Sequence, residues 1–482
     1  MNSRKKKALT RRNFIRNSTL AGAGVLILPR HVLGGKGYVA PSDKLVIAGI
    51  GAGGKGESDI ENFFKSGKAE IGFLCDVDDR QAVNTRKKFP NAKYYKDYRE
   101  MLDKEKKSID AVSVSTPDHM HAVQAMAAMQ LNKHVYVQKP LTHDIYEARM
   151  LTEAAHRYKV VTQMGNQGAS GDGVRKLVDW YKAGLIGDVH TIQCFTDRPI
   201  WPQGISRPKT GSAVPPEVDF DLWLGTAPKR DYFDGLLPFN WRGWWDYGTG
   251  ALGDMACHIM APVFAVLDLG YPVSAECSVA TPYVENWHKS YTPDSGPISS
   301  HIILTFKGQN GKPDLKLHWM DGGIQPERPA GLGPNEKMGD GGNGTIFLGT
   351  KGNMMCATYG ANPQLLPTSK TAETNVPRTL ALVPGSEDGH YAAWVEAAIA
   401  GYGTDKAKNL SSNFDIAGPL TESVLMGNLA IRSYNIQKVT GKDTSYPGRF
   451  IKLLWDGPNM KITNFEDANQ FVKRTYREGW KL

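Results

Sequence analysis

The chain has 482 residues, about three times a typical domain of ~150, which predicts two or three domains. It is 41% hydrophobic and 10% aromatic, which excludes a disordered, a collagen-like or a small disulfide-stapled protein. The 58 lysines and arginines exceed the 49 aspartates and glutamates, for a net charge of +9. Residues 1–40 carry nine cations and no acid, so the rest of the chain is neutral, which argues against a nucleic-acid partner.

The basic N-terminal segment has the layout of an export signal. Thr10-Arg11-Arg12-Asn13-Phe14-Ile15-Arg16 precedes an uncharged stretch over residues 18–28, and twin arginines mark the route that exports folded proteins. These 11 residues are too few for a membrane-spanning helix, which needs roughly 20. We therefore expect residues 1–34 to be a signal peptide that engages the twin-arginine export machinery, and the mature protein to be periplasmic. A disordered basic arm is the alternative, and no other segment predicts a stable membrane span.

The cysteines predict neither a disulfide framework nor a metal cluster, because they are five in number and never form a C-x-x-C pair. The five cysteines are Cys75, Cys194, Cys257, Cys277 and Cys356. Four of them lie in apolar runs, and buried thiols are therefore expected. A metal site needs at least three protein ligands, and the sequence offers only pairs, Asp118 with His121 or Asp254 with His258. We therefore expect no required metal.

A glycine-rich turn is the first motif after the leader. Residues 44–48 are an apolar run, residues 57–65 read as a helix, and Gly49, Gly51 and Gly54 between them form G-x-G-x-x-G. Glycines let the backbone approach a pyrophosphate, and the helix N-terminus offers free N–H groups to it. Strand, glycine turn and helix together therefore predict a dinucleotide site.

An acidic residue after the next strand indicates NAD. Residues 70–75 form that strand, and Asp76 follows it, 22 residues beyond Gly54. A carboxylate here accepts hydrogen bonds from both ribose hydroxyls and repels a 2′-phosphate, so we expect NAD rather than NADP. Asp78 and Asp79 add negative charge, although either can equally cap the helix that follows.

Strands and helices alternate through this half. The expected strands are 109–114, 133–137 and 160–164, and the expected helices are 119–130 and 145–158. The alternation predicts a doubly wound parallel sheet, in which ligands lie beyond the carboxyl ends of the strands. Two loops at those ends carry chemical groups, residues 115–121 (STPDHMH) and residues 138–143 (QKPLTH).

Together these motifs resemble the glucose–fructose oxidoreductase/inositol dehydrogenase/MocA (Gfo/Idh/MocA) family. The resemblance spans about residues 44–440 and rests on the glycine turn, Thr116-Pro117-Asp118-His119, Lys139-Pro140 and residues 250–258 (GALGDMACH). It implies an α/β fold: a Rossmann domain, then an α/β domain with a large open, mostly antiparallel sheet. The expected boundaries are 41–165 for the first, 166–440 for the second and 441–482 for a tail that packs on either domain.

The resemblance also implies a function and an assembly. Members of the family mostly oxidise or reduce sugars and cyclitols with a nicotinamide cofactor, and many form dimers or tetramers. We therefore expect a carbohydrate substrate and a homodimer or homotetramer. The leader and the tryptophan-rich middle of the chain are most similar to the exported, sugar-acting members.

One position departs from the family pattern. The family has Glu-Lys-Pro where this chain has Gln138-Lys139-Pro140, so a role of that carboxylate in holding the lysine is in doubt. His119 and His121 are expected to shape the loop on the nicotinamide side or to cap the next helix. The residues of these loops expected at the cofactor are Thr116, Pro117, His119, His121, Gln138 and Lys139.

The second half reads as strand-rich, with strands expected at 189–197, 273–280, 301–307, 314–319 and 345–348 and helices at 390–400 and 416–434. Between the first two strands, residues 199–249 are irregular and contain five of the eleven tryptophans. Indole faces stack on sugar rings, so one or two of these, Trp241 among them, are expected at the substrate and the rest in the core.

Asp254 and His258 lie four apart in a predicted helix, 253–267, and so share a face. In the family pattern these positions and Lys139 surround the reacting carbon. Oxidation of an alcohol needs a base at the hydroxyl while a hydride leaves the carbon. We assign His258 as the base, Lys139 as the cation that stabilises the alkoxide, and Asp254 as the group that fixes substrate or imidazole. The alternative is a helix cap and an ordinary buried histidine. Asn166, Gln167 and Tyr247 are expected hydroxyl ligands.

The expected export limits which reactions are possible. Because the periplasm has no NAD pool, the cofactor must stay bound to the protein and be returned to its starting oxidation state there. A sugar oxidoreductase with paired donor and acceptor meets this demand. So does a redox-neutral glycosidase that oxidises a ring hydroxyl, eliminates the glycoside, adds water and reduces, as in the NAD-dependent α-N-acetylgalactosaminidases of this family. A non-catalytic NAD-binding protein is the third hypothesis. We favour the oxidoreductase; the motifs do not separate it from the glycosidase.

Overall fold

The computed structural model describes residues 43–308 and 312–482, of which Leu45–Leu482 forms one compact unit. The expected signal peptide, residues 1–34, lies outside the described residues.

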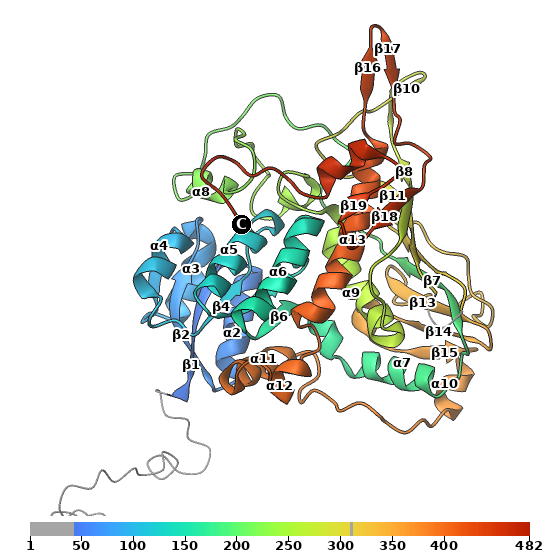
Figure 1. Ribbon diagram of the computed structural model, residues 1–482, viewed down its shortest axis with the longest axis horizontal. Helices are drawn as coiled ribbons and strands as arrows, with labels where there is room; N and C mark the ends of the chain where they lie inside the picture. The colour runs from blue at the N-terminus through green and yellow to red at the C-terminus, as the bar shows by residue number, and fades with distance from the viewer. Residues whose placement is uncertain (1–42, 309–311) are drawn as a thin grey trace, which may run out of the picture. The chain divides into compact units, whose positions relative to one another are not determined.

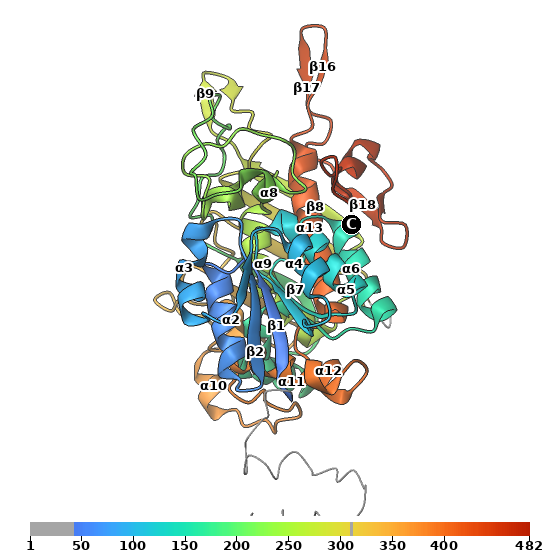
Figure 2. The same ribbon diagram turned by 90° about the vertical axis from the view of Figure 1, so that its left-hand side faces the viewer.

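The N-terminal half is a parallel sheet with helices on both faces, as predicted (Figures 1 and 2). The strand order is β3-β2-β1-β4-β5-β6, so the order reverses between β1 and β4, where ligands bind in such sheets. The strands are β1 (Leu45–Ile50), β2 (Ala69–Cys75), β3 (Lys93–Tyr95), β4 (Ala111–Val114), β5 (His134–Gln138) and β6 (Thr162–Gly165). The helices are α2 (Lys55–Lys65), α3 (Asp79–Lys88), α4 (Tyr98–Glu105), α5 (Asp118–Gln130) and α6 (Ile145–Tyr158).

The C-terminal half contains a second, nine-stranded sheet, which confirms the predicted large and mostly antiparallel one. Its order is β15-β14-β13-β7-β12-β11-β8-β18-β19, and among these described strands β7 and β12 alone pair in parallel. The strands are β7 (Val189–Phe195), β8 (Ser274–Ala280), β11 (Ser299–Phe306), β12 (Leu315–Met320), β13 (Gly344–Gly349), β14 (Asn353–Cys356), β15 (Gln364–Leu366), β18 (Leu453–Asp456) and β19 (Lys461–Ile462). Two small hairpins, β9 (Tyr283–Glu285) with β10 (His288–Lys289) and β16 (Lys438–Thr440) with β17 (Asp443–Ser445), stand apart from it.

Two long helices, α9 (Gly250–Leu267) and α13 (Phe414–Tyr434), pack together between the sheets (Figure 1). By length and composition α9 could cross a membrane, which corrects the expectation that no segment beyond the leader passes that test. However, 83% of this stretch is buried inside the protein, so α9 is a core helix here. The other helices of this half are α7 (Asp172–Lys182), α8 (Phe220–Leu224), α10 (Ser369–Glu373), α11 (Gly389–Ala400) and α12 (Asp405–Lys408).

Two segments from the C-terminal half of the chain, α11 and the tail, pack against the N-terminal Rossmann half. Trp394 of α11 packs on Phe63 of α2, with ring centroids 5.0 Å apart, in a buried cluster with β1 and β2. The tail adds β18 and β19 to the large sheet and then returns to the Rossmann half, so it packs on both (Figures 1 and 2). All five cysteines are free, and four are buried as predicted, while Cys277 is half-buried.

Candidate active site

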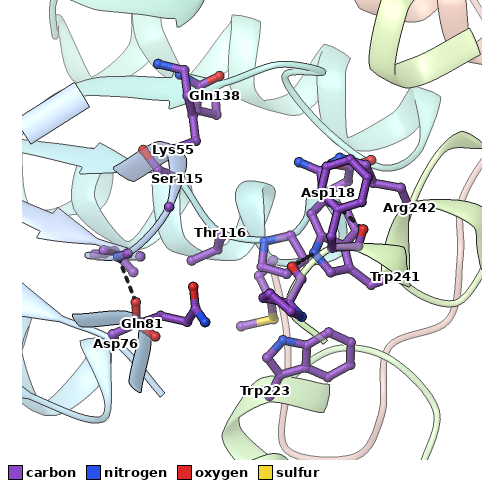
Figure 3. Close-up of a pocket in the computed structure, with 18 of the residues that line it drawn as sticks. Lys55, Asp76, Gln81, Ser115, Thr116, Asp118, Gln138, Trp223, Trp241 and Arg242 are labelled. Atoms are coloured by element: carbon purple, nitrogen blue, oxygen red, sulfur yellow. Dashed lines mark hydrogen bonds between the residues drawn. The ribbon is translucent and has the colours of Figure 1, made fainter. Parts of the chain in front are cut away.

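A cavity of about 470 Å³ lies at the point where the strand order reverses. Its walls come from the turns after β1, β2, β4 and β5, from α9 and from the segment 198–242 (Figure 3). Most of the predicted site residues line it: Gly51, Gly54, Asp76, Thr116, Pro117, Gln138, Lys139, Gln167, Trp241, Asp254 and His258. Five predicted residues are not among those that line it: Gly49, His119, His121, Asn166 and Tyr247.

The glycine turn has the geometry that a dinucleotide requires. Gly51 has φ +81°, and a Cβ there would lie 2.6 Å from the carbonyl oxygen of Ser115. Gly54 has φ +56° and precedes α2, whose first N–H groups receive no side-chain cap. Gly49 differs, since a Cβ there would meet Ile60 of α2 at 2.6 Å; it serves helix–strand packing. The turn and the helix start therefore fit a pyrophosphate.

Asp76 lies at one end of the cavity (Figure 3). Its carboxylate accepts hydrogen bonds from the backbone N–H of Ala52 at 2.9 Å, Gly53 at 3.1 Å and Asp78 at 3.0 Å. Burial raises the pKa of Asp76 to about 6, although these three bonds act in the opposite direction. The same carboxylate thus orders the glycine turn and faces the place where a ribose would bind.

The neighbouring acids Asp78 and Asp79 each have a cationic partner of their own. Asp78 caps α3 and pairs with Arg80 at 2.7 Å, while Asp79 pairs with Lys96 at 2.8 Å. Capping is therefore the role the structure gives Asp78. Asp76 and Asp78 both line the cavity, so the electrostatic case for NAD rather than NADP rests on these two carboxylates.

Lys139 and Asp254 form an ion pair in the cavity wall. The ammonium of Lys139, just after β5, donates to the Asp254 carboxylate at 2.8 Å and to its backbone oxygen at 2.7 Å. The Nε of Arg242 donates to the same carboxylate at 3.4 Å. Burial by itself would raise the pKa of Asp254, but Lys139 and Arg242 more than offset this and hold it below its usual value. The ionised form of Asp254 is therefore favoured, and both Lys139 and Asp254 line the cavity.

His258, one turn after Asp254 on α9, has a defined tautomer. The Asn166 amide donates to the carbonyl of Cys257 at 2.8 Å, so its oxygen faces His258 Nδ1 at 2.8 Å and accepts from it. The proton is thus on Nδ1, and Nε2, which has no hydrogen-bond partner among the described residues, carries a lone pair. Burial, with Lys139 next, lowers the pKa of His258 well below 6.5. His258 is a neutral, oriented base, and Asn166 orients it instead of lining the cavity.

The two histidines of the first loop lie behind the cavity wall. Both ring nitrogens of His121 face carbonyl oxygens at 2.8 Å, of Pro140 and Thr116, so His121 joins the two predicted loops. His119 packs on Trp223 and hydrogen-bonds its carbonyl oxygen at 3.0 Å. Burial lowers the pKa of His119 to about 3. These residues shape the loop, one of their two predicted roles, and do not line the cofactor cavity.

The aromatic segment 199–249 serves both core and cavity. Trp201, Trp223 and Trp241 are buried and line the cavity, and Trp244 and Trp245 are buried without lining it. Tyr247 is fully buried, and its hydroxyl accepts from Arg207 at 3.0 Å, so the predicted contact of Tyr247 with substrate is not formed by this arrangement.

Gln138 is bonded to a carboxylate from another element. Its amide donates to Asp59 of α2 at 2.8 Å. Asp59 is fully buried and also accepts from Ser115 at 2.9 Å, from Tyr391 at 3.0 Å and from Lys55, its i,i+4 partner. A negative charge therefore stands close to position 138 even though the family's glutamate is absent.

Sequence reasoning missed three residues that line the cavity, Lys55, Arg242 and Trp480, and the buried Asp59, which does not line it. Lys55 and Asp59 lie four apart directly after the glycine turn, a spacing that signals a helical ion pair. The sequence around Arg242 indicated a site only through the neighbouring tryptophans, and no motif or pattern pointed to Trp480, although both residues line the cavity. Within residues 43–308 and 312–482, no three His, Cys, Asp or Glu side chains are grouped as a metal site requires.

Comparisons with known proteins agree with this geometry. Residues 44–166 match the model of an oxidoreductase family with an NAD-binding Rossmann fold, and residues 174–306 match its C-terminal alpha/beta domain. Among solved structures, the WlbA dehydrogenase from Bordetella pertussis, in complex with NADH and UDP-GlcNAcA, has a TM-score of 0.51 at 14% identity, over 80% of this chain and 95% of that one. A levoglucosan dehydrogenase in complex with NADH and levoglucosan also has a TM-score of 0.51 at 14% identity, over 80% and 97%. At such identities the likeness shows the fold alone.

Relatives with closer sequences come from Shewanella. A glycosyl hydrolase family 109 protein of Shewanella pealeana is 26% identical over 228 residues, 42% of this chain and 50% of the relative. An alpha-N-acetylgalactosaminidase of Shewanella oneidensis is 29% identical over 189 residues, 36% of this chain and 40% of the relative. The chain thus matches half or less of the length of these relatives.

Proposed function

Because the chain belongs to the Gfo/Idh/MocA oxidoreductase family, we propose that it oxidises a ring CH–OH group of a sugar or sugar derivative by hydride transfer to tightly bound NAD. One observation carries the proposal: Lys139, Asp254 and His258 line the same cavity as the glycine turn and Asp76. The base, the cation and the cofactor cradle are thus within one space.

The cofactor would be held by the turn around Gly51 and Gly54, by the start of α2 and by Asp76. When bound, it supplies the hydride acceptor. His258 Nε2 takes the hydroxyl proton as the hydride leaves the carbon, so the alcohol becomes a ketone. The Lys139 ammonium donates to the oxygen as its negative charge develops. Asp254 fixes Lys139 in place, rather than the substrate or imidazole that we expected.

A second candidate is a redox-neutral glycosidase, and the similarity to an alpha-N-acetylgalactosaminidase favours it. In that reaction the ketone acidifies the neighbouring C–H, the glycoside is eliminated, water adds, and the ketone is reduced again. The cycle uses the same lysine and histidine. We also propose that the twin-arginine leader directs the protein to the periplasm, and because that compartment has no NAD pool, either candidate would need a cofactor that stays bound. Independently of this, we propose a homodimer or homotetramer.

The first experiment is to purify the mature chain without added cofactor, denature it, and quantify the released NAD(H) by mass spectrometry. Near-stoichiometric NAD(H) supports a cofactor that is reset in place. Sugar pairs and glycosides are then assayed in deuterated water, since deuterium incorporation beside the oxidised carbon identifies the glycosidase cycle. A protein that is empty and binds NAD only loosely contradicts a trapped cofactor.

Variants test the assigned residues. We expect Lys139→Ala and His258→Ala to lower turnover by about 10²–10⁴-fold while bound NAD(H) is retained. Lys106→Ala and His190→Ala, at exposed positions, are matched controls. Near-normal turnover of either cavity variant would overturn the assignment, and NAD(H) bound without turnover on any sugar would favour the non-catalytic hypothesis.

A further inference from the structure

Trp480, close to the C-terminus, lines the same cavity as Asp76, and its ring packs beside that of Tyr98. We propose that residues 474–482 form a strap that retains the dinucleotide, with Trp480 as a wall of the adenosine-binding end. This inference rests on the proposed NAD-dependent function and adds a binding residue that neither the fold nor the motifs identify.

The position of Trp480 identifies which part of the cofactor it faces. Asp76 follows β2 and marks the ribose, and the Gly51–Gly54 turn marks the pyrophosphate, so the adenosine extends away from Lys139. Tyr98, Leu222 and Trp480 line the cavity, and Tyr98 follows β3, the strand that pairs with β2 and its Asp76 end. The rings of Trp480 and Tyr98 have centroids 6.4 Å apart and an interplanar angle of 34°. Two aromatic rings beside a ribose site form a surface on which an adenine can stack.

Arg477 attaches the strap to α8. Its guanidinium pairs with the Asp221 carboxylate, donates to the Asp221 carbonyl at 2.9 Å and to the Gly225 carbonyl at 3.0 Å. Its backbone N–H donates to Thr226 at 3.0 Å. Three side-chain contacts and one backbone bond thus hold the residue three positions before Trp480.

The segment around α8 is itself bound to the loop that follows β2. The N–H of Asp79 donates to Glu217 at 3.2 Å, and the N–H of Asp219 donates to Val77 at 2.9 Å. These backbone bonds bring residues 217–219 onto the loop that carries Asp76. The adenosine end is therefore enclosed by three stretches of chain that lie far apart in sequence.

Arg474 attaches the start of the strap to the Rossmann half. Its guanidinium is largely buried and donates to Glu147 of α6 at 2.7 Å, and its backbone N–H donates to Asp144 at 3.1 Å. Tyr476 donates to the same Glu147 at 2.7 Å. Since a buried charge left without its partner is costly, the strap is strongly held in place. Figures 1 and 2 show the C-terminus close to α5, at the same end of the Rossmann half.

The strap explains how a cofactor can be kept. In this proposal Trp480 hinders release of the dinucleotide, and the contacts of Arg477 hold Trp480 in place. Such a strap would slow the turnover of an enzyme that exchanges its cofactor in each cycle. It would not slow an enzyme whose bound cofactor is both reduced and reoxidised within the site.

The test loads purified wild type and the variants Trp480→Ala and Arg477→Ala with isotope-labelled NAD. Each is then diluted into excess unlabelled NAD, and the labelled fraction still bound is followed by mass spectrometry. We expect release to be at least tenfold faster in both variants and unchanged in Trp287→Ala, which removes a tryptophan that is 94% exposed on the β9–β10 hairpin. Deletion of residues 479–482 should behave as Trp480→Ala.

The outcomes separate the strap from the proposed function. If wild type retains NAD and folded Trp480→Ala releases it at the same rate, the strap is wrong and the proposed function stands. If wild type binds no NAD, both are overturned.

Discussion

Gln138 shows how one residue can depart from a family pattern without loss of the local charge. Its amide donates to the buried carboxylate of Asp59, which comes from α2, 79 positions earlier in the chain. Three further groups bind the same carboxylate. A carboxylate from another helix thus lies beside position 138, and the residue at that position must be a donor.

This arrangement predicts the effect of restoring the family's residue. Gln138→Glu places a second carboxylate at hydrogen-bond distance from Asp59, so we expect a loss of about 1–3 kcal/mol in the free energy of unfolding. Adding Asp59→Asn supplies a donor again and should recover part of that loss. Urea denaturation of the two single variants and the double variant measures the coupling. Additive effects would show that the contact is unimportant.

The pH dependence of the reaction follows from His258. Burial and Lys139 lower its pKa well below 6.5, so Nε2 keeps its lone pair as the pH falls through 6.5. We expect the rate of NADH formation to be flat around pH 6.5, with its acid limb at lower pH. Stopped-flow absorbance of the NAD-loaded protein measures this.

A variant provides the matching control. Asn166→Asp would face the Nδ1–H with a carboxylate, raise the pKa of His258 and move the acid limb to higher pH. If the rate of the wild type instead falls around pH 6.5, and Asn166→Asp does not shift that fall, then a group other than His258 acts as the base.

At the scale of elements, local signals set how well boundaries can be predicted. The sequence predicts α6 at its observed bounds, because Asp144 and Glu147 form a capping box and Lys159 ends the helix in a left-handed conformation. The sequence did not predict the edge strand β3, because its three residues are too few to show an apolar pattern and none of them is buried. The amphipathic helix α7 was also missed.

Helix α11 packs where sequence order would not place it. Trp394 is fully buried between Phe63 and Tyr136 of the Rossmann half. We expect Trp394→Ala to reduce the free energy of unfolding by about 3–5 kcal/mol, because the indole leaves a cavity. Ile399→Ala on the same helix, at a side chain that is 46% exposed, should cost under ~1 kcal/mol. Equal losses in urea denaturation would contradict the packing argument.

At the scale of the whole molecule, the site lies where the two halves meet. Lys139 directly follows β5 of the parallel sheet, and Asp254 and His258 lie on α9, which packs between the sheets. Trp480, from the C-terminal segment, lines the same cavity. A single compact unit over Leu45–Leu482 is what such shared walls require.

The sequence by itself predicted the parallel sheet, the glycine turn and Asp76, because each depends on a local pattern or on a short motif. The family resemblance pointed to Lys139, Asp254 and His258, which the structure places in the wall of one cavity. Tertiary structure alone decided that Asn166 orients His258, that Asp59 faces Gln138, and that Trp480 lines the cavity. These contacts join residues from 79 to several hundred positions apart, and no periodicity or spacing along a chain records which distant side chains will share one buried space.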